Sequence, residues 1–219
     1  MEFIVLIGTP LLGAVWLGIS GARARAPDVN VLLSLVTLLA ACALTVRVIE
    51  NGDLLVAKDQ FFIDPFNVFL VTLTAFVGFT TALFSRPYMR IERDHGKLSG
   101  RQLKLYHSMY QLFMATMLIA LTTNNLGLMW VAMEAATLST VLLVTLYRTP
   151  ASLEASWKYF ILCGVGIAQA LFGTILLYFA AEKVLGSAGV DALLWTQLNA
   201  VKGQLEPAVL SLAFVFLLV

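Results

Sequence analysis

Six apolar runs, each long enough or nearly long enough to cross a bilayer, dominate this sequence. They cover residues 3–19, 29–49, 65–84, 106–121, 126–147 and 155–181. A helix rises ~1.5 Å per residue, so about 20 apolar residues cross the ~30 Å hydrocarbon layer. Only 12% of residues are charged, against about 25% in soluble domains. The sequence therefore predicts an all-α integral membrane protein.

A seventh apolar run begins after Pro207 and reaches Val219. Its roughly twelve residues are too few for a complete span, because a span needs about 20. We therefore expect a polytopic transmembrane helix bundle with six spans plus the start of a seventh. Residues 1–219 are expected to be a single transmembrane domain and the N-terminal fragment of a longer subunit.

Basic residues are distributed unequally between the predicted loops. Those that follow odd-numbered spans are Arg23, Arg25, Arg86, Arg90, Arg93, Lys97, Arg101, Lys104 and Arg148. The other loops hold only Lys58, Lys183 and Lys202, with Arg47 near one of them. Cytoplasmic loops retain positive charge, so the N-terminus is predicted to lie outside. A formal net charge of +1 gives no reason to expect a nucleic acid partner.

The longest polar stretch, residues 85–108, carries mixed charge and contains Pro87, Gly96 and Gly100. These residues interrupt helices, so the stretch is expected to be a connector on the cytoplasmic surface. Two interpretations stay open: a docking site for a peripheral partner, or a loop that faces lipid headgroups.

Glu134 is the one charged residue inside the run 126–147. At this depth even the mildest insertion scales assign an acidic group a cost of roughly 2.5–3.5 kcal/mol. Such a residue usually faces a protein interior or water and marks an ion path. The sequence therefore predicts that Glu134 takes up and releases protons. A purely structural role would require a buried hydrogen-bond partner.

Lys158 is the expected partner of Glu134. A short turn around Pro150 joins the two spans, so they should pack as antiparallel neighbours. The two side chains would then differ in depth by about 10 Å, which one or two waters could bridge. We predict a relay between them and no direct ion pair. The alternative is that Lys158 extends its ammonium to the cytoplasmic headgroups.

No other pattern points to a metal or cofactor site. Cys42 and Cys163 lie in apolar runs without a second ligand at suitable spacing, so both are expected to be packing residues. His95 and His107 are expected to be solvated or interfacial. The sequence contains no nucleotide-binding glycine loop, cysteine cluster or nucleophile elbow. We therefore expect no bound cofactor, and any redox chemistry would belong to other subunits.

A family resemblance is carried by two stretches, NNLGLMWVAMEAATLSTVLLV (residues 124–144) and LEASWKYFILCGVGIAQALFGTILLY (residues 153–178). Both resemble the antiporter-like membrane subunits of respiratory complex I, Mrp-type sodium/proton antiporters and group 4 nickel-iron hydrogenases. Within that set the chain is most similar to the hydrogenase-4 component F branch. The similarity extends upstream to FIDPFNVF (residues 62–69).

The resemblance implies a proton-translocating subunit in a bacterial or archaeal cell membrane, with other membrane subunits and lipid around it. Glu134 would match the family glutamate of the fifth helix, and Lys158 the lysine near the start of the sixth. Residues 1–105 would hold the first three helices and the cytoplasmic loop. Residues 106–219 would hold part of the first inverted repeat and stop before a lysine of the seventh helix.

Three functional hypotheses follow. The first is proton translocation coupled to redox chemistry in other subunits of a membrane-bound hydrogenase or complex I-like oxidoreductase. The second is a stand-alone cation/proton antiporter subunit, with sodium as an alternative ion. The third is a truncated, noncatalytic scaffold. Whether the parent assembly makes this chain part of an enzyme is left open by the residues.

Overall fold

Helices make up nearly all of the computed structural model, which describes residues 1–186 and 189–218. Their bounds are α1 Glu2–Ser20, α2 Ala26–Asn51, α3 Pro65–Asp94, α4 Gly100–Thr122, α5 Leu126–Val144, α6 Pro150–Leu185, α7 Trp195–Val201 and α8 Pro207–Leu218. Two 3-10 turns are η1 Thr145–Tyr147 and η2 Val190–Leu193. The short helix α7 lies between α6 and α8, in a stretch where the sequence predicts no membrane span.

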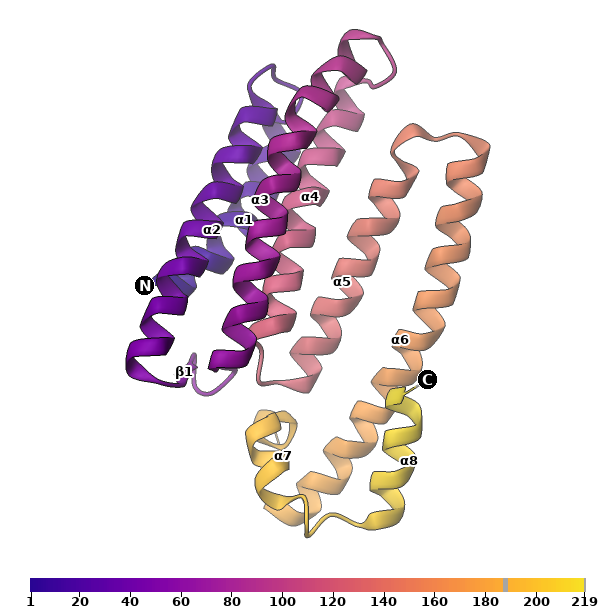
Figure 1. Ribbon diagram of the computed structural model, residues 1–219. Coiled ribbons are helices and arrows are strands. Elements are labelled where there is room, and N and C mark those ends of the chain that lie inside the picture. The colour runs from indigo at the N-terminus through magenta and orange to yellow at the C-terminus, as the bar shows by residue number, and fades with distance from the viewer. Residues whose placement is uncertain (187–188, 219) are drawn as a thin grey trace.

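The helices form two groups (Figure 1). Helices α1 to α4 pack side by side as a bundle, and α5 and α6 form an antiparallel hairpin whose α5 lies against α4. At the lower end of Figure 1, α7 lies across the base of the hairpin and α8 packs along α6. The site residues predicted from the sequence therefore belong to the hairpin and not to the bundle.

Local sequence signals determine where several helices begin. Asp64 and Ser99 each form a capping box. The side chain of the cap residue accepts a hydrogen bond from the backbone N–H three residues later, and the side chain of that later residue accepts one from the backbone N–H of the cap. Asn125 caps α5 and Thr149 caps α6, each through a side-chain oxygen that accepts from backbone N–H groups of the first turn. These caps satisfy backbone donors that a helix start would otherwise leave unpaired.

Five helices are long and apolar enough to cross a membrane: α1, α2, α3, α5 continued through η1, and α6. Helix α4 is not among them, because polar residues such as His107, Ser108 and Gln111 lower the hydropathy of its uncharged part. It nevertheless lies between α1 and α5 and runs antiparallel to both (Figure 1). A multi-helix membrane architecture is established, whereas the count of six spans stays a prediction.

The expected break at Pro87 is wrong, because α3 runs through it to Asp94. A proline in a helix removes one backbone hydrogen bond, and side chains beyond it hold the last turns. Arg90 Nη2 lies 2.6 Å from Asp28 Oδ2 of α2, and Lys97 Nζ lies 3.0 Å from Glu92 Oε1. The helix ends at Asp94, and two residues later Gly96 turns the chain with a φ of +71°, which suits glycine.

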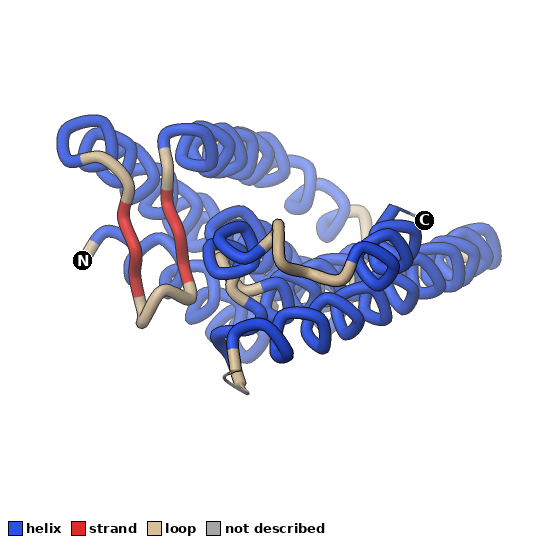
Figure 2. Tube along the Cα trace, turned by 90° about the horizontal axis from the view of Figure 1, so that it is seen from below, coloured by secondary structure: helices blue, strands red, loops and turns tan. Residues whose placement is uncertain are grey.

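The chain is also not entirely helical. Strands β1 Leu54–Val56 and β2 Phe61–Ile63 form an antiparallel hairpin between α2 and α3, drawn in red in Figure 2. Its turn bends through three consecutive residues with positive φ, Ala57 to Asp59. Ile63 is fully buried against the bundle. Three-residue strands are too short to show a period of two, so the sequence pattern did not reveal them.

Candidate functional site

Glu134 is the ninth residue of α5, about 12 Å from the start of that helix. Its side chain is half-buried. Its Oε2 atom is buried and has no hydrogen-bond partner among the described residues. The hydrogen-bonded partner that a purely structural glutamate would require is therefore not found there. An unpaired carboxyl oxygen in apolar surroundings favours a role in which a proton, a water or a cation reaches it.

Two hydrogen bonds set the register between α5 and α6. Trp130 Nε1 donates to the Ile167 carbonyl oxygen at 2.7 Å, and Thr140 Oγ1 donates to the Tyr159 hydroxyl at 3.2 Å. Because the helices are antiparallel, Glu134 lies level with residues 163–165 of α6. A Cβ added to Gly164 would meet nothing within 4 Å. The hairpin thus leaves open space at the level of the carboxylate.

Lys158 lies about 9 Å along the α6 axis from the level of Glu134. Its Nζ atom lies 2.5 Å from Glu154 Oε1 in the preceding turn, and the two side chains are 70% and 66% exposed. No hydrogen bond or ion pair joins Lys158 to Glu134 in the described part of the chain. Glu154 is therefore a competing partner of Lys158 that the sequence analysis missed, and the relay between Lys158 and Glu134 stays a prediction.

Gln169 of α6 is a second residue that the sequence analysis did not single out. It is half-buried, and its Oε1 atom is buried without a hydrogen-bond partner among the residues the structure describes. By the same register it lies within about two turns of Glu134 along the hairpin. A lone amide inside the apolar run 155–181 was the signal available in the sequence.

The N-terminal end of α5 is anchored by a hydrogen-bonded knot around Asn124. Its Nδ2 atom donates to the Asp59 carbonyl oxygen at 2.8 Å and to Thr196 Oγ1 at 2.9 Å. The Trp195 backbone N–H donates to the Asn124 carbonyl oxygen at 2.7 Å. These bonds join α5 to the β-hairpin and to α7, and so they fix the depth of Glu134.

The other end of the hairpin is held by a clasp, defined by Glu92, Tyr147, Tyr88 and Gln102. Tyr147 donates its hydroxyl to Glu92 Oε2 at 3.2 Å, and its oxygen lies 2.9 Å from the Tyr88 hydroxyl. Gln102 Nε2 donates to the Leu146 carbonyl oxygen at 2.6 Å. The polar stretch 85–108 therefore connects the bundle to the α5–α6 turn.

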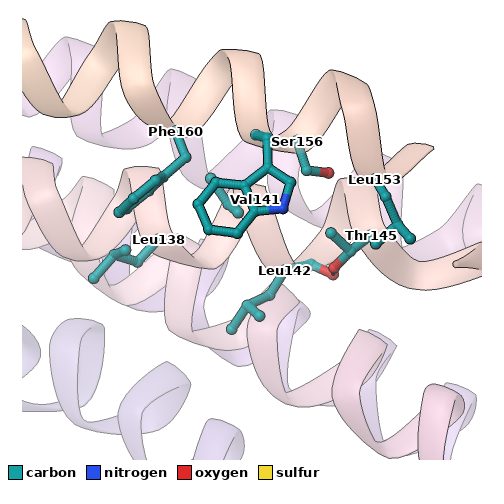
Figure 3. Close-up of a pocket in the computed structure, with 8 residues that line it drawn as sticks. Leu138, Val141, Leu142, Thr145, Leu153, Ser156 and Phe160 are labelled. Carbon is teal, nitrogen blue, oxygen red and sulfur yellow. The ribbon is translucent and has the colours of Figure 1, made fainter. Parts of the chain in front are cut away.

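A groove between α5 and α6 lies nearer their turn than Glu134 does (Figure 3). It encloses about 430 Å³, and Leu138, Val141, Leu142, Leu153, Trp157 and Phe160 supply most of its lining. The polar side chains at its edge are Thr145 and Ser156. This lining suits a hydrocarbon chain or an apolar side chain, and it offers no path for a proton.

The small residues near the site have two different roles. Gly173 meets Ala213 and Leu217 of α8, where an added Cβ would lie 2.9 Å from backbone and side-chain atoms. Gly173 therefore allows α6 and α8 to pack closely. Gly164 and Gly166 face open space instead. Within residues 1–186 and 189–218, no group of three or more His, Cys, Asp or Glu residues could hold a metal ion.

His107 is buried, contrary to the expectation from the sequence. The expectation of a solvated or interfacial histidine is wrong, because the side chain is only 1% exposed inside the bundle. Helix α4 begins at Gly100, two turns earlier than the apolar run suggests, and so His107 lies within the packed part of the helix. Gln111, one turn later on the same face, is equally buried.

Comparison with known proteins places this site in a family. Residues 123–219 match the family described as NADH:quinone oxidoreductase/Mrp antiporter, TM. A hydrogenase-4 component F homolog from Methylacidiphilum infernorum (isolate V4) is 51% identical over 170 residues, which cover 76% of this chain. The chain spans only 36% of that relative's length.

Two solved structures share the fold. A chain of the membrane-bound sulfane sulfur reductase, an archaeal respiratory membrane complex, matches 99% of this chain with a TM-score of 0.81 at 20% identity. A chain of the Mrp complex from Dietzia sp. DQ12-45-1b matches 99% with a TM-score of 0.75 at 22% identity. This chain covers 43% and 40% of those two chains. The sequence resemblance is confirmed, and the chain belongs to the antiporter-like membrane subunits of complex I, Mrp antiporter and hydrogenase type.

Proposed function

We propose that the chain is part of a proton-translocating subunit in a membrane-bound hydrogenase or complex I-like assembly. The observation that carries the proposal is Glu134, whose buried Oε2 atom has no hydrogen-bond partner among the described residues. A carboxyl group in such surroundings changes its protonation state when a nearby charge moves. Redox chemistry in other subunits would drive that movement.

Lys158 supplies the movable charge in this mechanism. In the structure it pairs with Glu154, and both side chains are largely exposed. An exposed pair of this spacing contributes only about 0.3–0.5 kcal/mol, so a competing charge can displace Lys158 from Glu154. Approach of the ammonium to Glu134 favours the ionised carboxylate, and its withdrawal favours the protonated acid. Alternation between these two arrangements moves a proton.

The proposal includes the surroundings of the subunit. Six spans with the N-terminus outside are supported by the basic loops and by the place of α4 between α1 and α5. Other membrane subunits are the expected partners, because the matched structures belong to multi-subunit complexes. A bacterial or archaeal cell membrane is the expected location. We also propose that residues 1–105 hold the first three helices and the cytoplasmic loop, and that residues 106–219 hold part of the first inverted repeat.

The test is Glu134→Gln in the full-length protein within its native complex, reconstituted into vesicles. Coupled proton uptake should fall by at least about tenfold, since removal of one ionisable group interrupts the relay. Glu50→Gln, which changes an exposed glutamate at the end of α2, is the matched control and should leave uptake unchanged. Undiminished pumping by Glu134→Gln would disprove the mechanism.

A cation/proton antiporter is the second candidate, favoured by the likeness to a chain of the Mrp complex. The same vesicles distinguish it. Sodium/proton exchange that persists without any redox partner, and that Glu134→Gln abolishes, would replace redox coupling with antiport. Intact assembly of the complex with no ion movement through this subunit would leave only the scaffold role.

A further inference from the structure

A polar cluster is buried inside the α1–α4 bundle, away from Glu134. It consists of Asn30 and Ser34 of α2 with His107 and Gln111 of α4, and none of the four is more than 3% exposed. Gln111 Nε2 donates to Asn30 Oδ1 at 2.9 Å and to Ser34 Oγ at 3.1 Å. We call these four residues the amide–histidine cluster.

The amide–histidine cluster is incompletely paired. Asn30 Nδ2, Gln111 Oε1 and both ring nitrogens of His107 have no hydrogen-bond partner among the described residues. Exchange of oxygen and nitrogen in both amides would reverse the bond between them and again leave one oxygen and one NH₂ group unpaired. Because buried polar groups are nearly always hydrogen-bonded, this cluster is built to hold a further partner.

The chemistry of the unpaired atoms identifies that partner. The Asn30 NH₂ group is a donor, the Gln111 oxygen is an acceptor, and a neutral imidazole at His107 adds one of each. A cation would satisfy only the acceptors, and an anion only the donors. Water both donates and accepts, and buried water typically makes about three hydrogen bonds to groups of this kind. The mixed set therefore selects water.

The nearest carboxylate on α2 does not compete for this place. Asp28, two residues before Asn30, lies 2.5 Å from Arg86 Nε and 2.6 Å from Arg90 Nη2 of α3. Its charge is thus held by the two guanidinium groups on the neighbouring helix. The cluster itself carries no fixed charge, which again suits a neutral ligand.

Room for water beside Gln111 depends on the position of the Leu33 side chain. A Cβ added to Gly13 of α1 would lie 3.6 Å from Gln111 Oε1 and only 2.7 Å from Leu33 Cδ1. The Leu33 methyl group therefore fills the place where α1 has no side chain. Leu33 also lines a groove of about 480 Å³ between α1 and α2. Rotation of its flexible end into that groove opens space next to the amide oxygen.

The cluster lies near the end of the bundle that carries most of the basic loop residues. Asn30 is the fifth residue of α2 and His107 the eighth of α4, so both lie within about 10 Å of the starts of their helices. Both starts are at the upper end in Figure 1. We propose that the amide–histidine cluster binds water, and that this water lets the ring proton of His107 exchange with solvent from that end.

The experiment uses the fact that the chain has two histidines. Protein labelled with ¹⁵N-histidine and embedded in lipid bilayers is studied by solid-state NMR, with polarisation transferred from water to the ring nitrogens. His95, which is exposed, is the hydrated reference, and His95→Gln assigns the two signals. We expect His107 to receive water polarisation within about twofold of the rate at His95, because a bound water lies beside it.

Variants locate the water. Gln111→Leu removes the hub of the cluster and should lower transfer to His107 by about fivefold or more, with His95 unchanged. Glu134→Gln should change neither signal, so this result is independent of the proposed function. A wild-type His107 that receives polarisation only from apolar protein protons, as in a dry core, would overturn the proposal. That wild-type measurement decides the question even if Gln111→Leu does not fold.

Discussion

The α1–α4 bundle and the α5–α6 hairpin are built from similarly apolar helices but bury very different shares of them. In the apolar stretches of α1, α2 and α3, 28%, 33% and 28% of residues are buried, against 17% in α5 and 11% in α6. Mean hydropathy does not separate the groups, since α6 at 2.2 lies between α1 at 2.0 and α2 at 2.3. Hydropathy therefore identifies membrane helices and does not tell which of them have neighbours.

The bundle and the hairpin also differ in where they hold their polar residues. The bundle encloses its polar side chains and joins them to each other, as Gln111 joins Asn30 and Ser34. The hairpin carries the ionisable pair Glu154 and Lys158 on an exposed face. We interpret the bundle as the rigid support and the hairpin as the part whose charges can rearrange.

Truncation of a bundle leucine should give the largest effect. Leu118 is fully buried and Leu162 of α6 is 75% exposed. Leu118→Ala should lower the free energy of unfolding by about 2–3 kcal/mol, the low end for cavity formation, because lipid solvates the unfolded side chain. Leu162→Ala should cost less than about 0.5 kcal/mol. Unfolding in mixed detergent measures both, and equal losses would contradict the comparison.

Glycine substitutions should give the next largest difference. A Cβ at Gly78 would lie 2.3 Å from Met114 Cε, whereas a Cβ at Gly164 would meet nothing within 4 Å. Gly78→Ala should destabilise the protein by about 1 kcal/mol, the low end for overpacking, because only the flexible end of the buried Met114 side chain has to move. Gly164→Ala should be neutral or stabilise by up to about 1 kcal/mol through helix propensity. If Gly164→Ala destabilised the protein in lipid, a neighbour would have to cover that face.

Removal of one hydroxyl tests the clasp that connects the two regions. Tyr147→Phe breaks the hydrogen bonds to Glu92 and Tyr88 and should cost about 0.5–1.5 kcal/mol. Proteolysis or hydrogen exchange should show the loosening at the α5–α6 turn, with the core of the bundle unaffected. Tyr159→Phe, which removes the α5–α6 bond to Thr140, is the control within the hairpin.

The smallest stability effect should come from the exposed ion pair. Glu154→Gln removes the partner of Lys158 and should change the free energy of unfolding by only about 0.3–0.5 kcal/mol. Its effect on function should be larger, because Lys158 is then free to approach Glu134. Proton uptake by the full-length complex should become less dependent on salt. Loss of more than about 1 kcal/mol would mean that the pair is structural.

Much of the fold could be predicted because it depends on local properties. Apolar runs, caps such as Asp64 and Ser99, and the length of each helix are set by neighbours in sequence. The predictions failed where local sequence signals are weak or where contacts distant in the sequence are involved. Helix α3 continues past Pro87 to a contact of Arg90 with Asp28 on another helix, and the β-hairpin is too short to show a pattern.

The sequence alone determined that this chain is a membrane protein and that Glu134 lies deep in an apolar helix. Both conclusions follow from the length and composition of the apolar runs, which depend only on the order of residues in the chain. The tertiary structure decided which groups meet: Lys158 binds Glu154, Glu134 lies level with Gly164, and His107 is enclosed with Gln111. These contacts depend on the register between helices, and that register is set by packing over many residues distant in the sequence.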